Sequence, residues 1–237
     1  MATTFSPSQY QATITKLDAM PDKITGATNK IISIADDALG WIPFLGDAIK
    51  DALNKLKGWV MKLVAKINDI LKPAEVPATM YNIAQIWDGL RTQAGTVAST
   101  LNGDQEKYGN EWQGIAGGKY SSGVPDQISA AQTFSSSCGT IASGCNSIAS
   151  AGLGFYLSCL GAVESVLISL IAAIATAETV VGPIISLCAG IASCLISIGS
   201  AYYQLTHNLS NATQSLDGVI TPQSTYPGGS WPLATAQ

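Results

Sequence analysis

Two long apolar segments between Leu153 and Leu205 constrain the fold more than any other feature. The first, residues 153–177, contains a single charged residue, Glu164, and the second, residues 179–206, contains none. Each is long enough to cross the ~30 Å hydrocarbon layer of a membrane as a helix, which takes roughly 20 residues. The pair therefore predicts a helical hairpin, which either spans a membrane or forms the buried centre of a soluble helical bundle.

Two carboxylates and a helix-breaking pair interrupt this hairpin. Glu164 lies within the first segment, Glu178 lies between the two, and Gly182 and Pro183 lie at the start of the second. A carboxylate in an apolar span is costly and usually faces water or a protein interior. We expect these four residues to mark the positions where the hairpin hinges and opens, although both carboxylates also suit partly exposed sites in a soluble bundle.

The clearest amphipathic helix is expected from Leu45 to Leu71. Its apolar residues recur at helical spacing, and Pro43 and Pro73 flank it as helix punctuation. Lysines line its polar side, and a basic amphipathic helix can lie on an anionic membrane surface. The predicted membrane-surface lysines are Lys50, Lys55, Lys57, Lys62 and Lys66. The alternative is the solvated outer face of a bundle helix.

The predicted fold class is all-α: an elongated multi-helix bundle of long antiparallel helices with a central apolar helical hairpin. The first helix is expected to begin at Ser6-Pro7 or Ser8. A glycine-containing stretch from Gly117 to Pro125 is expected to be loose, with a helix resuming at Asp126. The expected segments are N-terminal amphipathic helices (1–73), a helical hairpin (74–152), the apolar hairpin with a polar extension (153–216) and an extended tail (217–237).

A Trp-x-Gly sequence, Trp112 to Gly114, separates two of the predicted helices. Residues 79–152 thereby resemble the WxG family of helical hairpins secreted by type VII systems, in which a Trp-x-Gly turn joins two antiparallel helices. The resemblance implies that the Trp112 ring packs between the helices and that Gly114 lets the backbone reverse. An ordinary helical bundle with a tryptophan in a turn fits the same residues.

Two export signals have no match. The N-terminus lacks a basic region followed by an apolar core, so no cleaved signal peptide is expected. The WxG family also carries a tyrosine followed four residues later by an acidic residue, but Thr206 and His207 stand four residues after Tyr202 and Tyr203. We expect a protein that is secreted without a cleaved signal, or cytoplasmic before release, and conditionally membrane-associated.

The residue inventory argues against several kinds of chemistry. The chain has one histidine and none of the common hydrolase, phosphate-loop or dinucleotide motifs, so neither an enzyme, a cofactor nor a metal site is expected. A net charge of −4 disfavours nucleic acid as a partner. The five cysteines suit small buried positions, although bridges between helices, such as Cys159 to Cys188 or Cys194, stay open.

Two functions remain for such a chain. The first is a secreted or released helical protein that self-assembles as a homo-oligomer and engages membrane lipids conditionally, in the manner of a pore-forming toxin. The second is a non-enzymatic type VII secretion substrate or partner whose apolar helices pair with another helical chain. A permanent membrane protein is disfavoured, because no basic residues flank the hairpin to set its orientation.

Overall fold

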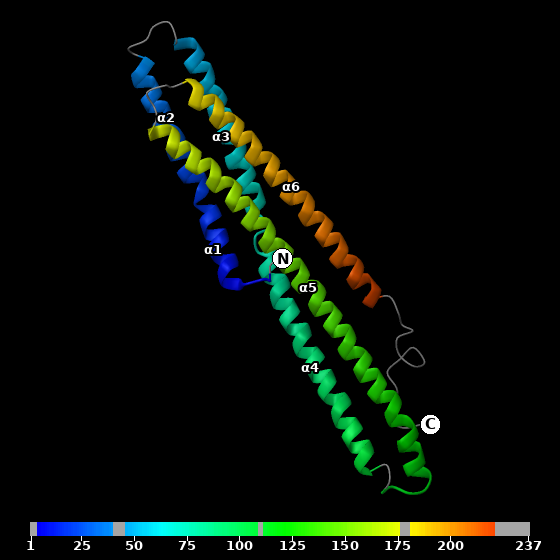
Figure 1. Ribbon diagram of the computed structural model, residues 1–237. Helices are drawn as coiled ribbons and strands as arrows, with labels where there is room; N and C mark the ends of the chain where they lie inside the picture. The colour runs from blue at the N-terminus through cyan, green and yellow to red at the C-terminus, as the bar shows by residue number, and fades with distance from the viewer. Residues whose placement is uncertain (1–3, 40–45, 109–110, 176–180, 221–237) are drawn as a thin grey trace. The chain divides into compact units, whose positions relative to one another are not determined.

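The computed structural model describes residues 4–39, 46–108, 111–175 and 181–220, and the regular secondary structure in these ranges consists of α-helices joined by short turns (Figure 1). The all-α prediction is confirmed. The helices are α1 (Pro7–Asp18), α2 (Met20–Leu39), α3 (Gly46–Leu71), α4 (Val76–Tyr108), α5 (Ile115–Ala175) and α6 (Val181–Ile220). Glu178 and the predicted tail after residue 220 lie outside the described residues.

Contacts group the chain into two compact units. The first unit contains residues 1–78 and 150–207, and the second contains residues 79–149 and 208–237. Both α5 and α6 contribute one end to each unit. The four consecutive segments expected from the sequence describe the order of the chain and stay a prediction.

The amphipathic helix α3 supplies much of the core of the first unit. Its predicted apolar stripe is confirmed, because Leu56, Leu63 and Ile67 are fully buried. They lie in one core with Leu17 of α1 and Ile24 of α2, helices that both contact α3. Burying a side chain of this size stabilises the fold by roughly 1.5–3 kcal/mol. The apolar face of helix α3 is therefore part of the core of the first unit, independently of any role of its lysines.

Helix α1 begins where the sequence predicts. The side chain of Ser6 accepts a hydrogen bond from the Gln9 amide at 3.4 Å, and Pro7 occupies the first turn, where its missing N–H costs nothing. Further along, the Tyr10 hydroxyl donates to the carbonyl of Ala74, and the Tyr156 hydroxyl donates to the carbonyl of Ile70 at 2.9 Å. These bonds connect α1 and α5 to the end of α3.

The second unit is built from small side chains. In α4, Ala94 and Ala98 are buried, and Ala98 packs in a cluster with Val124, Ile128 and Ala131 of α5. In the same unit, a side chain added at Gly144 of α5 would meet Leu216 of α6 at 2.8 Å. Small residues permit helices to approach closely, so the Ser, Ala and Gly content of this part of α5 serves packing.

Two predicted helix breaks are wrong. Residues 115–125 are helical, and the separate helices expected on either side of residue 152 are one helix, α5, that contains Pro125. Pro125 is exposed while Val124 and Ile128 beside it are buried, so burial of these neighbours outweighs the one missing amide. Gly182 and Pro183 lie in the first turn of α6, where proline is compatible with a helix, and not in a break before it.

Candidate functional site

The apolar hairpin lies in the first unit, where the ends of α5 and α6 run antiparallel (Figure 1). The ring of Phe155 on α5 faces that of Tyr202 on α6, with centroids 6.4 Å apart. Nearer the other end of the hairpin, Ser165 and Ser169 of α5 share a small groove with Leu187 and Ser193 of α6. Residues early in one segment thus pair with residues late in the other.

One side of this hairpin is buried and the other is exposed. Val163 and Leu170 of α5 are fully buried, as are Ile184, Ile191 and Ile198 of α6. By contrast, four isoleucines are largely exposed: Ile168 at 67%, Ile171 at 55%, Ile185 at 61% and Ile196 at 72%. Within the first unit, only one face of α5 and one face of α6 therefore contribute to the core.

Among the described residues, two helices are long and apolar enough to cross a membrane by length and composition: Ile115–Ala175 and Ile184–Val219. Only 28% of the most apolar part of each is buried. The hairpin is therefore only partly buried, on one face of each of its helices. The apolar runs continue around both helices, so they offer more apolar surface than one packed face takes up.

Helix α6 carries three different rows of side chains. The buried row faces the core, and beside it runs an exposed row of small residues at alternating spacings of four and three: Ser186, Gly190, Ser193, Ser197 and Ser200. A third row, which we call the apolar row, consists of Ile185, Ile196 and Tyr203. Their spacings of eleven and seven residues bring them onto one face, since a helix turns about 100° per residue.

The predicted membrane-surface lysines are divided between two edges of α3. Lys55, Lys62 and Lys66, which we call the lysine row, share one edge, because spacings of seven and four residues return to nearly the same angle. Lys50 and Lys57 share another edge, about 140° away. All are exposed except Lys66, which is half-buried.

The lysine row lies next to α6. The Lys66 ammonium is 6.0 Å from the centre of the Tyr202 ring, and Lys55 interacts electrostatically with the thiol of Cys188. Between them, Lys62 lies 4.7 Å over the ring of Trp59. Cations over aromatic faces are attracted by the ring quadrupole. These contacts bring positive charge and aromatic rings together along one side of the apolar hairpin.

The remaining predicted hinge residues are not brought into one site. Glu164 is half-buried on α5, and Glu178 lies outside the described residues. The structure describes only the backbone of Gly182 and Pro183, which is helical and belongs to α6. Their role as opening points stays a prediction.

The Trp-x-Gly turn precedes α5 in the second unit. Gly114 has a φ of +87°, a left-handed conformation that glycine adopts without strain. Trp112 is 58% exposed, and its ring lies 5.6 Å from the ring of Tyr120. The expected packing of this ring into the seam between two helices is therefore wrong, because the ring pairs with an aromatic neighbour on α5 and stays largely in solvent.

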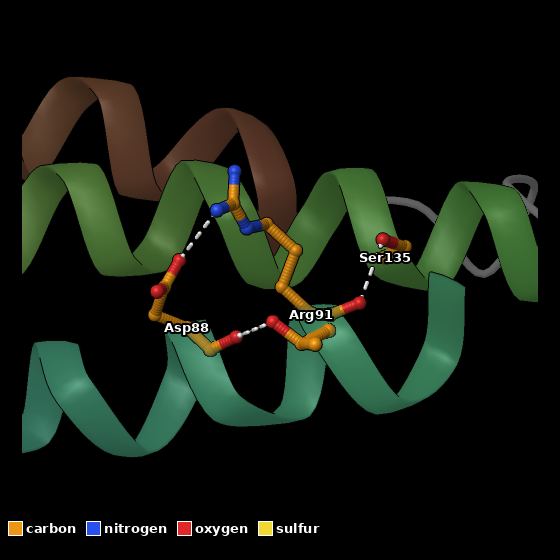
Figure 2. Close-up of polar contacts among 4 residues, drawn as sticks. Asp88, Arg91 and Ser135 are labelled. Carbon is orange, nitrogen blue, oxygen red and sulfur yellow. Dashed lines mark hydrogen bonds and ion pairs between the residues drawn. The ribbon is translucent and has the colours of Figure 1, made fainter. Parts of the chain in front are cut away.

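The second unit also contains a polar groove that was not predicted from the sequence. An open hollow of about 690 Å³ is lined by Ser, Thr and Gly of α5 together with Arg91 of α4 and Ser215 of α6. Figure 2 shows Arg91 paired with Asp88 at 2.8 Å, and Ser135 donating to the carbonyl of Arg91 at 2.9 Å. The charge of Arg91 is thus matched on its own helix, and the hydroxyls serve helix packing.

All five cysteines are free thiols, so neither of the possible bridges from Cys159 is formed. Within the described ranges, the structure holds no cluster of three or more histidine, cysteine or acidic side chains that would bind a metal ion. The most distinctive arrangement in the first unit is therefore the half-exposed apolar hairpin beside the lysine row.

Comparisons with protein families, with curated proteins and with solved structures find no match to this chain.

Proposed function

We propose that this chain is a non-enzymatic helical protein that engages lipid membranes through its apolar hairpin and self-assembles there, in the manner of helical pore-forming proteins. The observation that carries the proposal is the exposed face of the hairpin, where Ile168 and Ile171 of α5 and Ile185 and Ile196 of α6 face solvent. The proposal includes release from the producing cell and membrane association only under some conditions.

The energetics favour transfer of this face to lipid. Moving an exposed isoleucine into an apolar environment is favourable by roughly 1.5–3 kcal/mol when the side chain becomes fully covered. Backbone groups in α5 and α6 are already hydrogen-bonded within the helices, so the bilayer would impose little further cost on them. The exposed small row of α6 supports self-assembly, since serine and glycine let helices approach closely in a membrane.

The test introduces charge on the apolar row. The double variant Ile185→Glu with Ile196→Glu leaves the buried row of α6 intact, and its matched control, Gln204→Glu with Gln214→Glu, adds the same charge at exposed polar positions of that helix. We expect the first variant to lose dye release from liposomes and flotation with them, and the control to keep both. Absence of binding and leakage by the unmodified chain, over a range of pH and lipid composition, would refute the proposal.

A specific observation favours a second candidate function, that of a type VII secretion substrate or partner that pairs with another helical chain. On α4, Ile86 is 64% exposed and Val97 is 47% exposed, and eleven residues separate them, so they share one face. Exposed Trp112 and Ile115 add apolar surface at the turn. A stable heterodimer that protects this face of α4 from hydrogen exchange, together with inert behaviour on liposomes, would favour this function over the first.

A further inference from the structure

The apolar row of α6 and the lysine row of α3 belong to the same unit and to neighbouring helices. We propose that together they form a preformed docking surface for an anionic phospholipid bilayer, on which the folded protein lies flat before its hairpin inserts. This inference rests on the proposed function and specifies the lipid class and the first step. Its components are Ile185, Ile196 and Tyr203 of the apolar row and Lys55, Lys62 and Lys66 of the lysine row.

The contacts between α3 and α6 keep the two rows together. Lys66 lies over Tyr202, and Tyr203, the next residue, is 71% exposed at the end of the apolar row. Lys55 interacts with Cys188, which is three residues from Ile185 at the row's other end. The interactions of the lysine row with α6 therefore fall near both ends of the apolar row.

The dimensions suit flat docking. From Ile185 to Tyr203 the apolar row spans eighteen residues of helix, about 27 Å. An amphipathic surface buries its apolar residues to a depth of about 5–10 Å, while lysines beside them reach the phosphates through their long stems. Trp59 and Tyr203 are of the types enriched at the level of the headgroups.

Charge complementarity identifies the occupant as an anionic surface. Across the described residues, no ion pair forms at Lys55, Lys62 or Lys66, and the neighbouring carboxylate of Asp69 is paired with Lys72 at 2.7 Å. Helix α6 contains no acidic residue before Asp217. The surface therefore combines exposed isoleucines with lysines that form no ion pair among the described residues. An acidic protein partner would satisfy the lysines, but it would leave the isoleucines uncovered.

The experiment compares two triple variants of the full chain. Lys55→Gln, Lys62→Gln and Lys66→Gln remove the lysine row, and Lys16→Gln, Lys23→Gln and Lys30→Gln remove the same charge from exposed positions on α1 and α2 in the first unit. Binding is measured by flotation with vesicles of phosphatidylcholine alone and with 30% phosphatidylglycerol. Far-UV circular dichroism checks that each variant is folded.

For the unmodified chain we expect stronger binding to the anionic vesicles and weaker binding as salt is raised, because surface attraction is screened. Loss of the lysine row is expected to weaken binding to anionic vesicles by roughly 100-fold, since each of the three lysines near the surface contributes about fivefold. The control triple is expected to bind within about threefold of the unmodified chain.

Three outcomes separate the two proposals. Equal binding to neutral and anionic vesicles, or equal losses in both triple variants, overturns the docking surface and leaves the proposed function standing. Binding to neither kind of vesicle overturns both. Selective loss in the lysine-row variant, with the Ile185→Glu and Ile196→Glu variant also failing to bind, supports both.

Discussion

At the scale of single residues, two glycines only two positions apart on α5 have different surroundings. A side chain at Gly152 would overlap the ring of Pro77, whereas one at Gly154 would meet nothing within 4 Å. We expect Gly152→Ala to destabilise the protein by about 1–3 kcal/mol, because a proline ring cannot rotate away. Gly154→Ala should be neutral or stabilising by up to about 1 kcal/mol. Urea denaturation followed by circular dichroism measures both, and equal midpoints would contradict the packing described.

The Tyr10 side chain links stability to pH. Burial, followed by its interaction with Tyr156, raises the pKa of Tyr10 above the usual value near 10. Between pH 10 and this higher value, the unfolded chain releases the phenolic proton while the folded chain keeps it. The stabilisation is thus complete below pH 10 and is lost as pH rises further.

The variant Tyr10→Phe isolates this effect. It removes the bond to the Ala74 carbonyl and should cost about 1 kcal/mol of unfolding free energy at pH 8. The difference in unfolding free energy between the two proteins should be smaller at pH 11. By that pH the unmodified protein has lost part of the stabilisation from Tyr10, whereas phenylalanine does not titrate. Parallel pH profiles of the two proteins in urea denaturation would show that Tyr10 does not resist ionisation in the folded state.

At the scale of elements, α5 tolerates a proline that would ordinarily end a helix. Pro125 is exposed and removes one backbone donor from the ladder. We expect Pro125→Ala to restore that bond and stabilise α5 by about 1–3 kcal/mol, with slower hydrogen exchange over residues 121–129. Asp126→Ala, an exposed neighbour that leaves the ladder unchanged, is the control. Exchange rates that respond equally to both changes would argue against the missing bond as the weak point.

At the scale of the whole molecule, the exposed hairpin face predicts a response to apolar surroundings. Size-exclusion chromatography in plain buffer should show a chain of 24.5 kDa, and a mild detergent should shift it to a larger assembly beyond the added micelle. The assembly is expected because an apolar environment covers the isoleucines and leaves the small row of α6 available for helix contacts. Ile185→Glu with Ile196→Glu should stay monomeric. An unmodified chain that remains monomeric in detergent would argue against self-assembly.

Much of the helical architecture follows from local pattern. The stripe of α3 repeats at helical spacing over its whole length, so its bounds and its buried residues were predictable. The start of α1 was predictable for a similar reason, since Ser6 and Pro7 act within one turn. Such features depend on residues a few positions apart, and sequence spacing reports them directly.

The candidate site was predictable only in part. The apolar content of the sequence identifies the hairpin, and the helical spacing of α3 predicts that its lysines lie on the polar side of that helix. Their division into two edges, with Lys66 over Tyr202, depends on which helix packs against α3. Likewise, the exposure of Trp112 depends on its pairing with Tyr120.

The sequence by itself determined that this chain is helical and where its apolar surface is concentrated, because both are properties of short-range order along the chain. Only the tertiary structure decided which apolar face is buried. Ile184 and Ile185 are adjacent and chemically identical, yet one is 2% exposed and the other 61%. The difference arises because α6 presents one of them to the core and the other to solvent. One face of the hairpin therefore holds the first unit together, and the other remains exposed to solvent.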